Sequence, residues 1–191
     1  MRARGQVIVI VAVLLMVLLL LLAVAVDGGR LYIERGRTVR AAQAGADAGI
    51  GRVADQMVTQ AVVRQTEAAV RPACVPDAGF GTPGTSCTAT PLPGEVSHWL
   101  TDDDRATLVA PEMQTAVAAE ALDYAGRNGL KQTDPEILAL HVEYPNNYDP
   151  VGPAVQLLLP VKRRMTILLS GLLGLDSVTL EADGLSELPQ K

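Results

Sequence analysis

The chain has 191 residues, of which 49% are hydrophobic but only 3% are aromatic. Aromatic side chains usually contribute much of a buried core, so this balance is unusual for an ordinary globular domain. The net charge of −5 excludes the overall basic character expected of a nucleic-acid-binding protein, so no nucleic acid partner is expected. With 2 cysteines and 2 histidines, the composition argues against a structural zinc site made within the chain.

The N-terminal segment contains an unbroken apolar run from Val7 to Val26. About twenty residues of α-helix rise about 30 Å, which is the thickness of the hydrocarbon core of a bilayer. A helix is required there because lipid offers no hydrogen-bond partner to a free backbone group. We therefore expect residues 7–26 to form a transmembrane helix and residues 1–6 to form a short cytoplasmic tail.

A cleavable signal peptide is the competing interpretation of this run. Ala23-Val24-Ala25 fits the small-x-small pattern of a cleavage site. However, the apolar run is long for a signal peptide, and it continues past that site. A retained anchor is therefore favoured over cleavage.

Charge alone does not decide on which side of the membrane the C-terminal part lies. The arginines after the apolar run outnumber those before it, which by the positive-inside rule would place the rest of the chain in the cytoplasm. That rule weakens when a long domain follows. Cys74 and Cys87 flank a loop, residues 74–87, that is rich in Gly, Pro and Thr, and such loops are often closed by disulfides in oxidising compartments. A disulfide here favours an outside domain, with two unpaired buried thiols as the alternative.

Residues 27–71 are predicted to extend the anchor helix into water as an amphipathic helix. Gly28 and Gly29, at the membrane edge, mark the expected position of a kink. Apolar and small residues recur beyond them at a three-and-four spacing, which places them on one helical face. These residues are Val39, Ala42, Ala46, Ile50, Val53, Met57 and Ala61.

Four small residues within this helix, Ala42, Gly45, Ala46 and Gly49, are candidates for close helix packing. Small side chains let a neighbouring helix or sheet approach closely. Two alternatives stay open for the helix. It packs on its own domain, which we expect for its C-terminal half, or it contacts another protein, which we expect near the membrane.

Residues 72–191 are predicted to form an α+β domain. Thr101 followed by Asp104 indicates a helix start, and Pro111 suits the first turn of a second helix that ends at Asn128-Gly129. Alternating apolar residues then predict strands at 138–144, 155–161 and 178–182. The expected fold class is therefore α+β, in which a long N-terminal transmembrane helix extends into an amphipathic helix packed on a small antiparallel sheet.

Two patterns that resemble binding sites have simpler explanations. Residues 79–84 match G-x-G-x-x-G, but neither a strand nor a helix flanks them, so a nucleotide site is not expected. Asp102, Asp103 and Asp104 could bind a cation, yet consecutive helical residues point in different directions. Acids in a first turn stabilise the helix dipole, which favours solvated first-turn carboxylates.

No catalytic arrangement is apparent in the rest of the chain. His98 and His141 are far apart, and no serine or cysteine stands in a recognisable nucleophile setting. Residues 162–164, Lys-Arg-Arg, could contact anionic lipid or an acidic partner, or could form a solvated turn after the second strand. We therefore expect a protein that is not an enzyme, with no cofactor, no metal site and no small-molecule substrate.

The N-terminal quarter of the chain combines several features in a fixed order. They are Arg4-Gly5, the apolar run, Asp27, Gly29-Arg30, Tyr32, Arg35, Arg37 and the Ala-rich stretch from Arg40 to Ala48. Together they resemble the N-terminus of TadE/TadG-like proteins, which are minor pilins or pseudopilins of the Flp (tight-adherence) pilus assembly system. The C-terminal order of a strand, a Leu- and Gly-containing stretch at 171–174 and a closing strand is also similar. Processed prepilins have Glu where this chain has Ile10, which favours an unprocessed anchor.

This resemblance implies a non-catalytic, single-pass protein of the cytoplasmic (inner) membrane of a bacterium, with its C-terminal domain outside the cytoplasm. The implied partners are the lipid bilayer and pilus-assembly subunits or other minor pilins, in a system for adhesion or secretion. Its mechanism would be mechanical, with anchor helices packed side by side. The alternative function is a tethered or secreted extracytoplasmic binding domain unrelated to pili.

Overall fold

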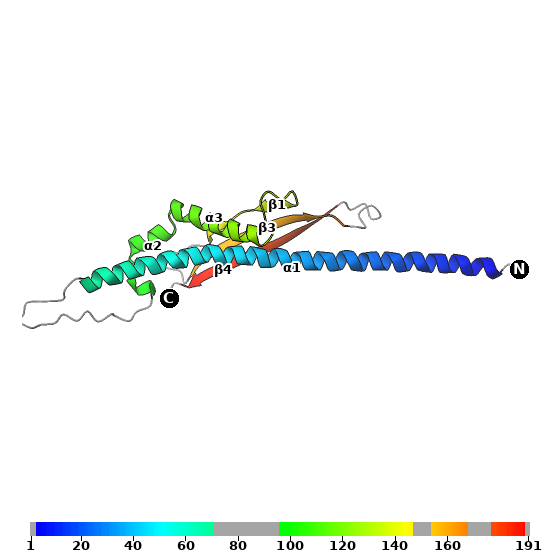
Figure 1. Ribbon diagram of the computed structural model, residues 1–191, viewed down its shortest axis with the longest axis horizontal. Coiled ribbons are helices and arrows are strands. Elements are labelled where there is room, and N and C mark those ends of the chain that lie inside the picture. Colours follow the sequence, from blue (N-terminus) through cyan, green and yellow to red (C-terminus); the bar gives the residue numbers. More distant parts are fainter. Residues whose placement is uncertain (1–2, 71–95, 147–153, 168–176, 190–191) are drawn as a thin grey trace, which may run out of the picture. The chain divides into compact units, whose positions relative to one another are not determined.

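The computed structural model describes residues 3–70, 96–146, 154–167 and 177–189 (Figure 1). It confirms the predicted α+β class, with one long N-terminal helix and a small antiparallel sheet. In chain order the elements are α1 (Ala3–Val70), η1 (Val96–Trp99), α2 (Asp102–Leu108), α3 (Pro111–Arg127), β1 (Ile137–Leu140), β2 (Glu143–Asn146), β3 (Ala154–Met165) and β4 (Val178–Pro189).

Helix α1 joins the apolar run and its predicted extension into one element. It is helical without interruption from Ala3 to Val70. Gly28 and Gly29, where a kink was expected, do not interrupt it. The change from apolar run to amphipathic extension is therefore a change in side-chain chemistry along one continuous helix.

Strand β3 is the central partner of the sheet. β1 and β2 both pair with it antiparallel, with Leu140 opposite Val161 and Glu143 opposite Leu158, and β4 pairs with it as well. A single strand was predicted over residues 138–144, but His141 and Val142 separate β1 from β2. Both ladders contain register shifts, and such bulges locally disrupt strand pairing.

The helix ends carry the local signals expected from the sequence. Thr101 is the N-cap of α2, and its side chain and that of Asp104 form a capping box. Pro111 occupies the first position of α3, where its missing N–H costs nothing. Gly129, just past the end of α3, has a φ of 98°, a left-handed conformation that glycine adopts without a steric penalty. These predictions are confirmed.

The chain divides into two compact units. Unit 1 comprises Met1–Gly45, Leu122–Val142 and Leu159–Gly184, and unit 2 comprises Ala46–Ala121, Glu143–Leu158 and Leu185–Lys191. Each unit therefore contains a part of α1 and a part of the sheet.

Unit 1 is packed around a close approach between α1 and β4. Ala41 and Ala42 on the helix are buried, at 3% and 0% exposed. A Cβ added to Gly184 on β4 would lie 2.3 Å from the carbonyl oxygen of Ala42 and 2.8 Å from the backbone nitrogen of Gln43. The strand thus rests on the helix backbone itself, at a distance that only a residue without a side chain allows.

Unit 2 has a corresponding contact at Gly49. A Cβ there would lie 2.6 Å from Cδ1 of Leu157 on β3 and 3.1 Å from Cβ of Ala121 on α3. Both of those residues are fully buried. The hydroxyl of buried Tyr144 donates a hydrogen bond to the carbonyl of Leu108 at 2.8 Å, which ties β2 to the end of α2.

We expect Gly184→Ala to destabilise the full chain by about 1–3 kcal/mol, because the new methyl group meets backbone atoms that cannot rotate away. Gly51→Ala is the matched control, since a Cβ on Gly51 in α1 meets nothing within 4 Å. It should be neutral or stabilising by up to about 1 kcal/mol, because alanine favours the helix. Denaturant unfolding of the detergent-solubilised protein measures both, and equal effects would contradict the close approach.

Candidate membrane anchor and interaction surfaces

The first part of α1 is the candidate membrane-spanning segment. Its apolar side chains are exposed, as shown by Leu14 at 61% and Leu18 at 58%. The most apolar part of the helix has a mean hydropathy of 3.7, and none of it is buried within the chain. A helix with these properties is long and apolar enough to cross a membrane, although a signal sequence would meet the same criterion.

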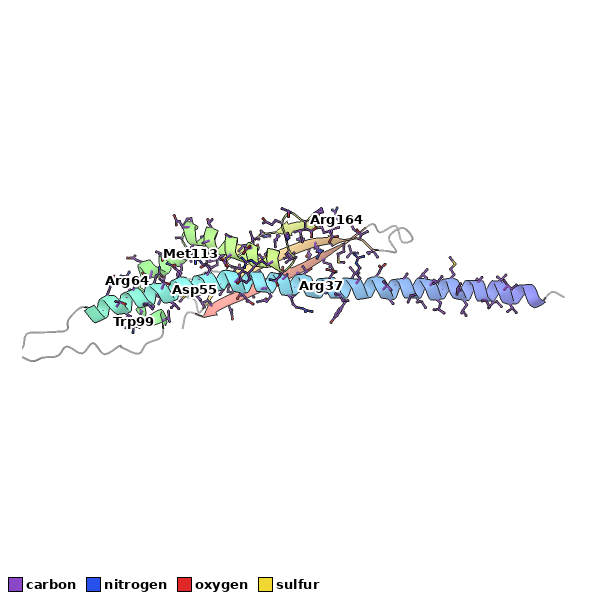
Figure 2. All side chains as sticks on the ribbon, in the orientation of Figure 1. Arg37, Asp55, Arg64, Trp99, Met113 and Arg164 are labelled. Atoms are coloured by element: carbon purple, nitrogen blue, oxygen red, sulfur yellow. The ribbon has the colours of Figure 1, made fainter. Side chains whose placement is uncertain are left out.

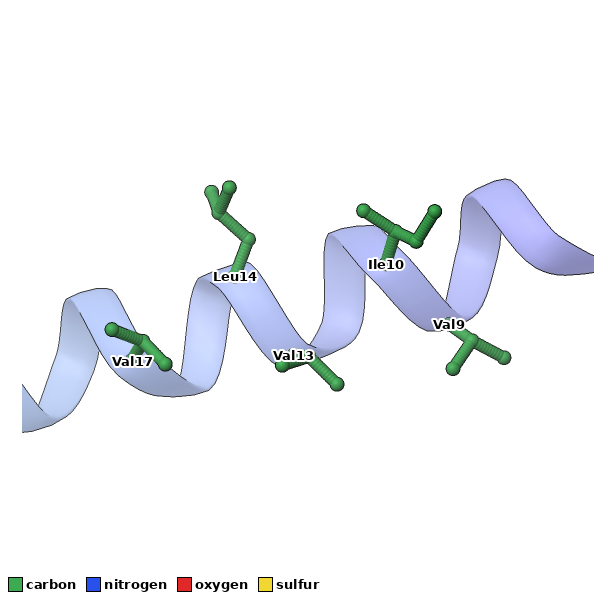
Figure 3. A pocket seen from close by; sticks show the side chains of 5 residues that line it. All are labelled: Val9, Ile10, Val13, Leu14 and Val17. Carbon is green, nitrogen blue, oxygen red and sulfur yellow. The ribbon is translucent and has the colours of Figure 1, made fainter.

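A shallow groove runs along this segment and is lined by apolar side chains alone (Figure 3). Lipid chains or the side chains of another helix fit such a surface, whereas it offers no donor or acceptor to a polar ligand. The lining residues are Val9, Ile10, Val13, Leu14 and Val17.

The apolar run ends at a buried acid. Asp27 is 7% exposed, whereas the preceding Val26 is 50% exposed. It is the first charged residue after the run, and it belongs to the features that resemble the TadE/TadG-like N-terminus. From Asp27 onwards, other parts of the chain therefore pack against one side of α1.

The three basic residues at 162–164 lie inside β3, so a solvated turn, one of the two alternatives for them, is wrong. Arg163 is 18% exposed and pairs with Glu34 at 3.4 Å and with Glu136 at 2.7 Å. Glu34 also accepts a hydrogen bond from Arg37 at 3.0 Å. Glu34 on α1 and Glu136 just before β1 therefore neutralise this largely buried cation within the strand.

Lys162 has its own partner across the sheet. Its ammonium lies 2.8 Å from the carboxylate of Glu181 on β4. The hydrogen bond that Lys162 donates to the Glu181 carboxylate raises the pKa of Lys162 above its ordinary value. Both side chains are more than half exposed, so this pair contributes little to stability.

The four helix-packing candidates are all buried. Ala42 packs under Gly184 in unit 1, and Gly49 packs against Leu157 in unit 2. The structure thus places these residues in contact with the chain's own sheet and helices, and their contact with another protein stays a prediction. Small residues with open space around them lie nearer the apolar run, where a Cβ on Gly28 or Gly29 would meet nothing within 4 Å.

The remaining candidates from the sequence are the two cysteines, the glycine pattern and the possible metal ligands. Cys74 and Cys87, and the glycine pattern at 79–84, fall outside the described residues, so the disulfide stays a prediction. His141 lies exposed between β1 and β2. Within the ranges that the structure describes, no three His, Cys, Asp or Glu side chains are grouped to hold a metal ion.

An ion pair that the sequence did not indicate joins α1 to α2 within unit 2. Arg64, labelled in Figure 2, donates from Nε and Nη2 to the two carboxylate oxygens of Asp104, both at 3.0 Å. Asp104 also accepts hydrogen bonds from the backbone and hydroxyl of Thr101, at 3.0 and 2.7 Å. Arg64 and then Thr101 hold the pKa of Asp104 well below its usual range.

The sequence predicted three solvated acids in the first turn of α2, and this prediction is wrong for Asp104. Asp102 and Asp103 are exposed, but Asp104 is only 7% exposed. The capping box was predictable from the spacing of Thr101 and Asp104. The ion-pair partner of Asp104 was not predictable, because Arg64 lies 40 residues away in the sequence.

Comparison with known families finds a match for the N-terminal part of the chain. Residues 5–56 match the family model Tad, described as "Putative Flp pilus-assembly TadE/G-like". This segment is TadE/G-like. The match confirms the resemblance inferred from the sequence, and it covers the apolar run together with the beginning of the amphipathic part of α1. Comparisons with curated proteins and with solved structures found no match.

We expect Asp104→Asn to lower stability at neutral pH and to reduce the loss of stability in acid. The pKa of Asp104 is lower in the folded protein than the value of about 4 in an unfolded chain. Its stabilising contribution is therefore present above about pH 4 and is lost as the pH falls below that value. Denaturant unfolding at several pH values between about 2 and 7 measures the change.

Asp103→Asn is the matched control, because this neighbouring acid is exposed. Its unfolding free energy should follow the wild-type pH dependence closely. If Asp104→Asn and wild type lose stability in parallel as the pH falls, the Arg64 pair does not lower the pKa of Asp104 as described.

Proposed function

We propose that this chain is a non-catalytic, membrane-anchored, minor pilin-like protein that takes part in the assembly of Flp/Tad-type pili for adhesion or secretion. The observation that carries the proposal is the TadE/G-like match over residues 5–56, which supports a pilus-related role. The exposed apolar part of α1 supports a single-pass membrane protein. We place it in the inner membrane of a bacterium, with the C-terminal domain outside the cytoplasm.

The proposed mechanism is mechanical. The apolar part of α1 packs beside the anchor helices of other pilus-assembly subunits, and the α+β domain offers a docking surface outside the membrane. Within lipid, helices associate through close packing, because burying apolar surface gains nothing over contact with lipid chains. Gly28 and Gly29, which have open space around them, are suited to such a contact, whereas Gly49 is already packed.

The chemistry of the described residues supports a binding role over a catalytic one. Asp104 is the acid with a displaced pKa, and it is engaged by both Arg64 and Thr101. A carboxylate held by this many donors is stabilised as the anion and is poorly suited to exchange protons near neutral pH. Its role in the proposal is to attach α2 to α1.

Intact mass of the protein from a membrane fraction tests whether the anchor is retained. We expect a chain that begins at Met1 or Arg2, because residue 10 is Ile where processed prepilins have Glu. A chain beginning at Gln6 would indicate prepilin processing and incorporation into the fibre. A chain beginning at Val26 would show signal-peptide cleavage, which would overturn the anchor and favour a secreted binding domain.

A bulky substitution at the membrane edge tests the helix contact. We expect Gly29→Leu to reduce the number of pili per cell several-fold at an unchanged protein level, because the new side chain separates helices that approach closely there. Gly51→Leu on the same helix is the control and should leave piliation unchanged. Normal piliation in Gly29→Leu cells would refute this contact. Gly49 is unsuitable for the test, because a side chain there collides with Leu157.

A further inference from the structure

Four exposed arginines follow the apolar run on the part of α1 that belongs to unit 1. Three of them are Arg30, Arg35 and Arg40, and we call these three the arginine collar. Among the residues that the structure describes, no ion pair involves any of them, whereas the nearby Arg37 is paired with Glu34. The collar is also a local concentration of positive charge in a chain of net charge −5.

The collar lies at the height of a membrane surface if the apolar run spans the bilayer. At about 1.5 Å per residue, Arg30 is about 6 Å beyond Val26, Arg35 about 14 Å and Arg40 about 21 Å. The headgroup region is about 5–8 Å thick on each side of a bilayer, and attraction reaches about 10 Å further at ordinary ionic strength. By its backbone position, Arg30 therefore falls among the headgroups and Arg35 falls within reach of their charge, whereas the backbone of Arg40 lies about 3 Å beyond that reach.

The side chains lean towards the membrane, which brings their charges closer than their backbones. Helical side chains point back towards the N-terminus, and here that is the direction of the apolar run. Arg40 shows this directly, because its Nη2 lies 3.7 Å from the place where a Cβ on Gly36 would be. Its guanidinium thus lies one helical turn nearer the apolar run than its own Cα.

The spacing of the collar distributes charge around the helix. The three arginines follow at intervals of five residues, which turn the helix by about 140° each time. A protein partner would contact one side of α1, whereas a membrane surface surrounds the helix where it emerges. The angular distribution therefore favours lipid over an acidic protein.

Tyr32 adds an independent observation at the same height. It is 82% exposed and stands two residues after Arg30. Tyrosine is enriched where membranes meet water, since its ring is apolar and its hydroxyl can remain hydrated. An exposed tyrosine among exposed arginines is the composition expected of a helix segment in the headgroup layer.

We infer that the arginine collar binds the headgroups of anionic phospholipids in the leaflet from which α1 emerges. The guanidinium groups donate paired hydrogen bonds to phosphate oxygens, for which their planar geometry is suited. This inference rests on the retained anchor of the proposed function.

The test uses the full chain in non-ionic detergent, titrated with phosphatidylglycerol or phosphatidylcholine and observed by native mass spectrometry. We expect tighter binding of phosphatidylglycerol. Substituting Gln at all three collar positions should weaken that binding by about fivefold for each arginine removed, and should leave phosphatidylcholine unaffected. Gln at Arg52, Arg127 and Lys131, three exposed cations outside the collar, is the matched control and should keep the preference.

Flotation of the reconstituted wild type with vesicles separates failure of the anchor from failure of this inference. A chain that does not float with any vesicle overturns both. A chain that floats but binds the two lipids equally, or whose control variant loses the preference as fully as the collar variant, overturns the lipid inference alone. If the collar variant keeps the preference but fails to assemble pili in cells, the collar contacts an acidic protein and the inference is wrong.

Discussion

The structure depends on the close approach of strands to the backbone of α1, which small side chains on one face of the helix permit. In unit 1 this is the contact of Gly184 with Ala42, and in unit 2 it is the contact of Gly49 with Leu157. Cores of this kind are built from Ala, Val and Leu at short distances and need little aromatic volume. This explains how a chain with 3% aromatic residues packs a core.

The buried face of α1 and the helix ends were predictable because they depend on local spacing. The three-and-four pattern identified residues that are buried in the structure, from Ala42 to Ala61, although it wrongly included Val39, which is 39% exposed. The partners of Arg64 and Arg163 were not predictable, since Asp104, Glu34 and Glu136 become neighbours only through the tertiary fold. The anchor was evident from composition, but the open glycines at its edge required coordinates.

Helix α1 has two parts whose side chains meet different surroundings. Its first part has exposed apolar side chains on all sides, and its later part buries one face under the chain's own sheet and helices. The apolar segment and the packed part of α1 in unit 1 belong to one helix without a break in its helical assignment.

The missing side chain of Gly184 also fixes how the last strand is aligned. A shift of β4 by one residue would bring Asp183 or Leu185 onto the backbone of Ala42, where not even a methyl group fits. It would also turn every side chain of the strand to the opposite face of the sheet. A single glycine thus excludes the two neighbouring alignments of β4 on α1.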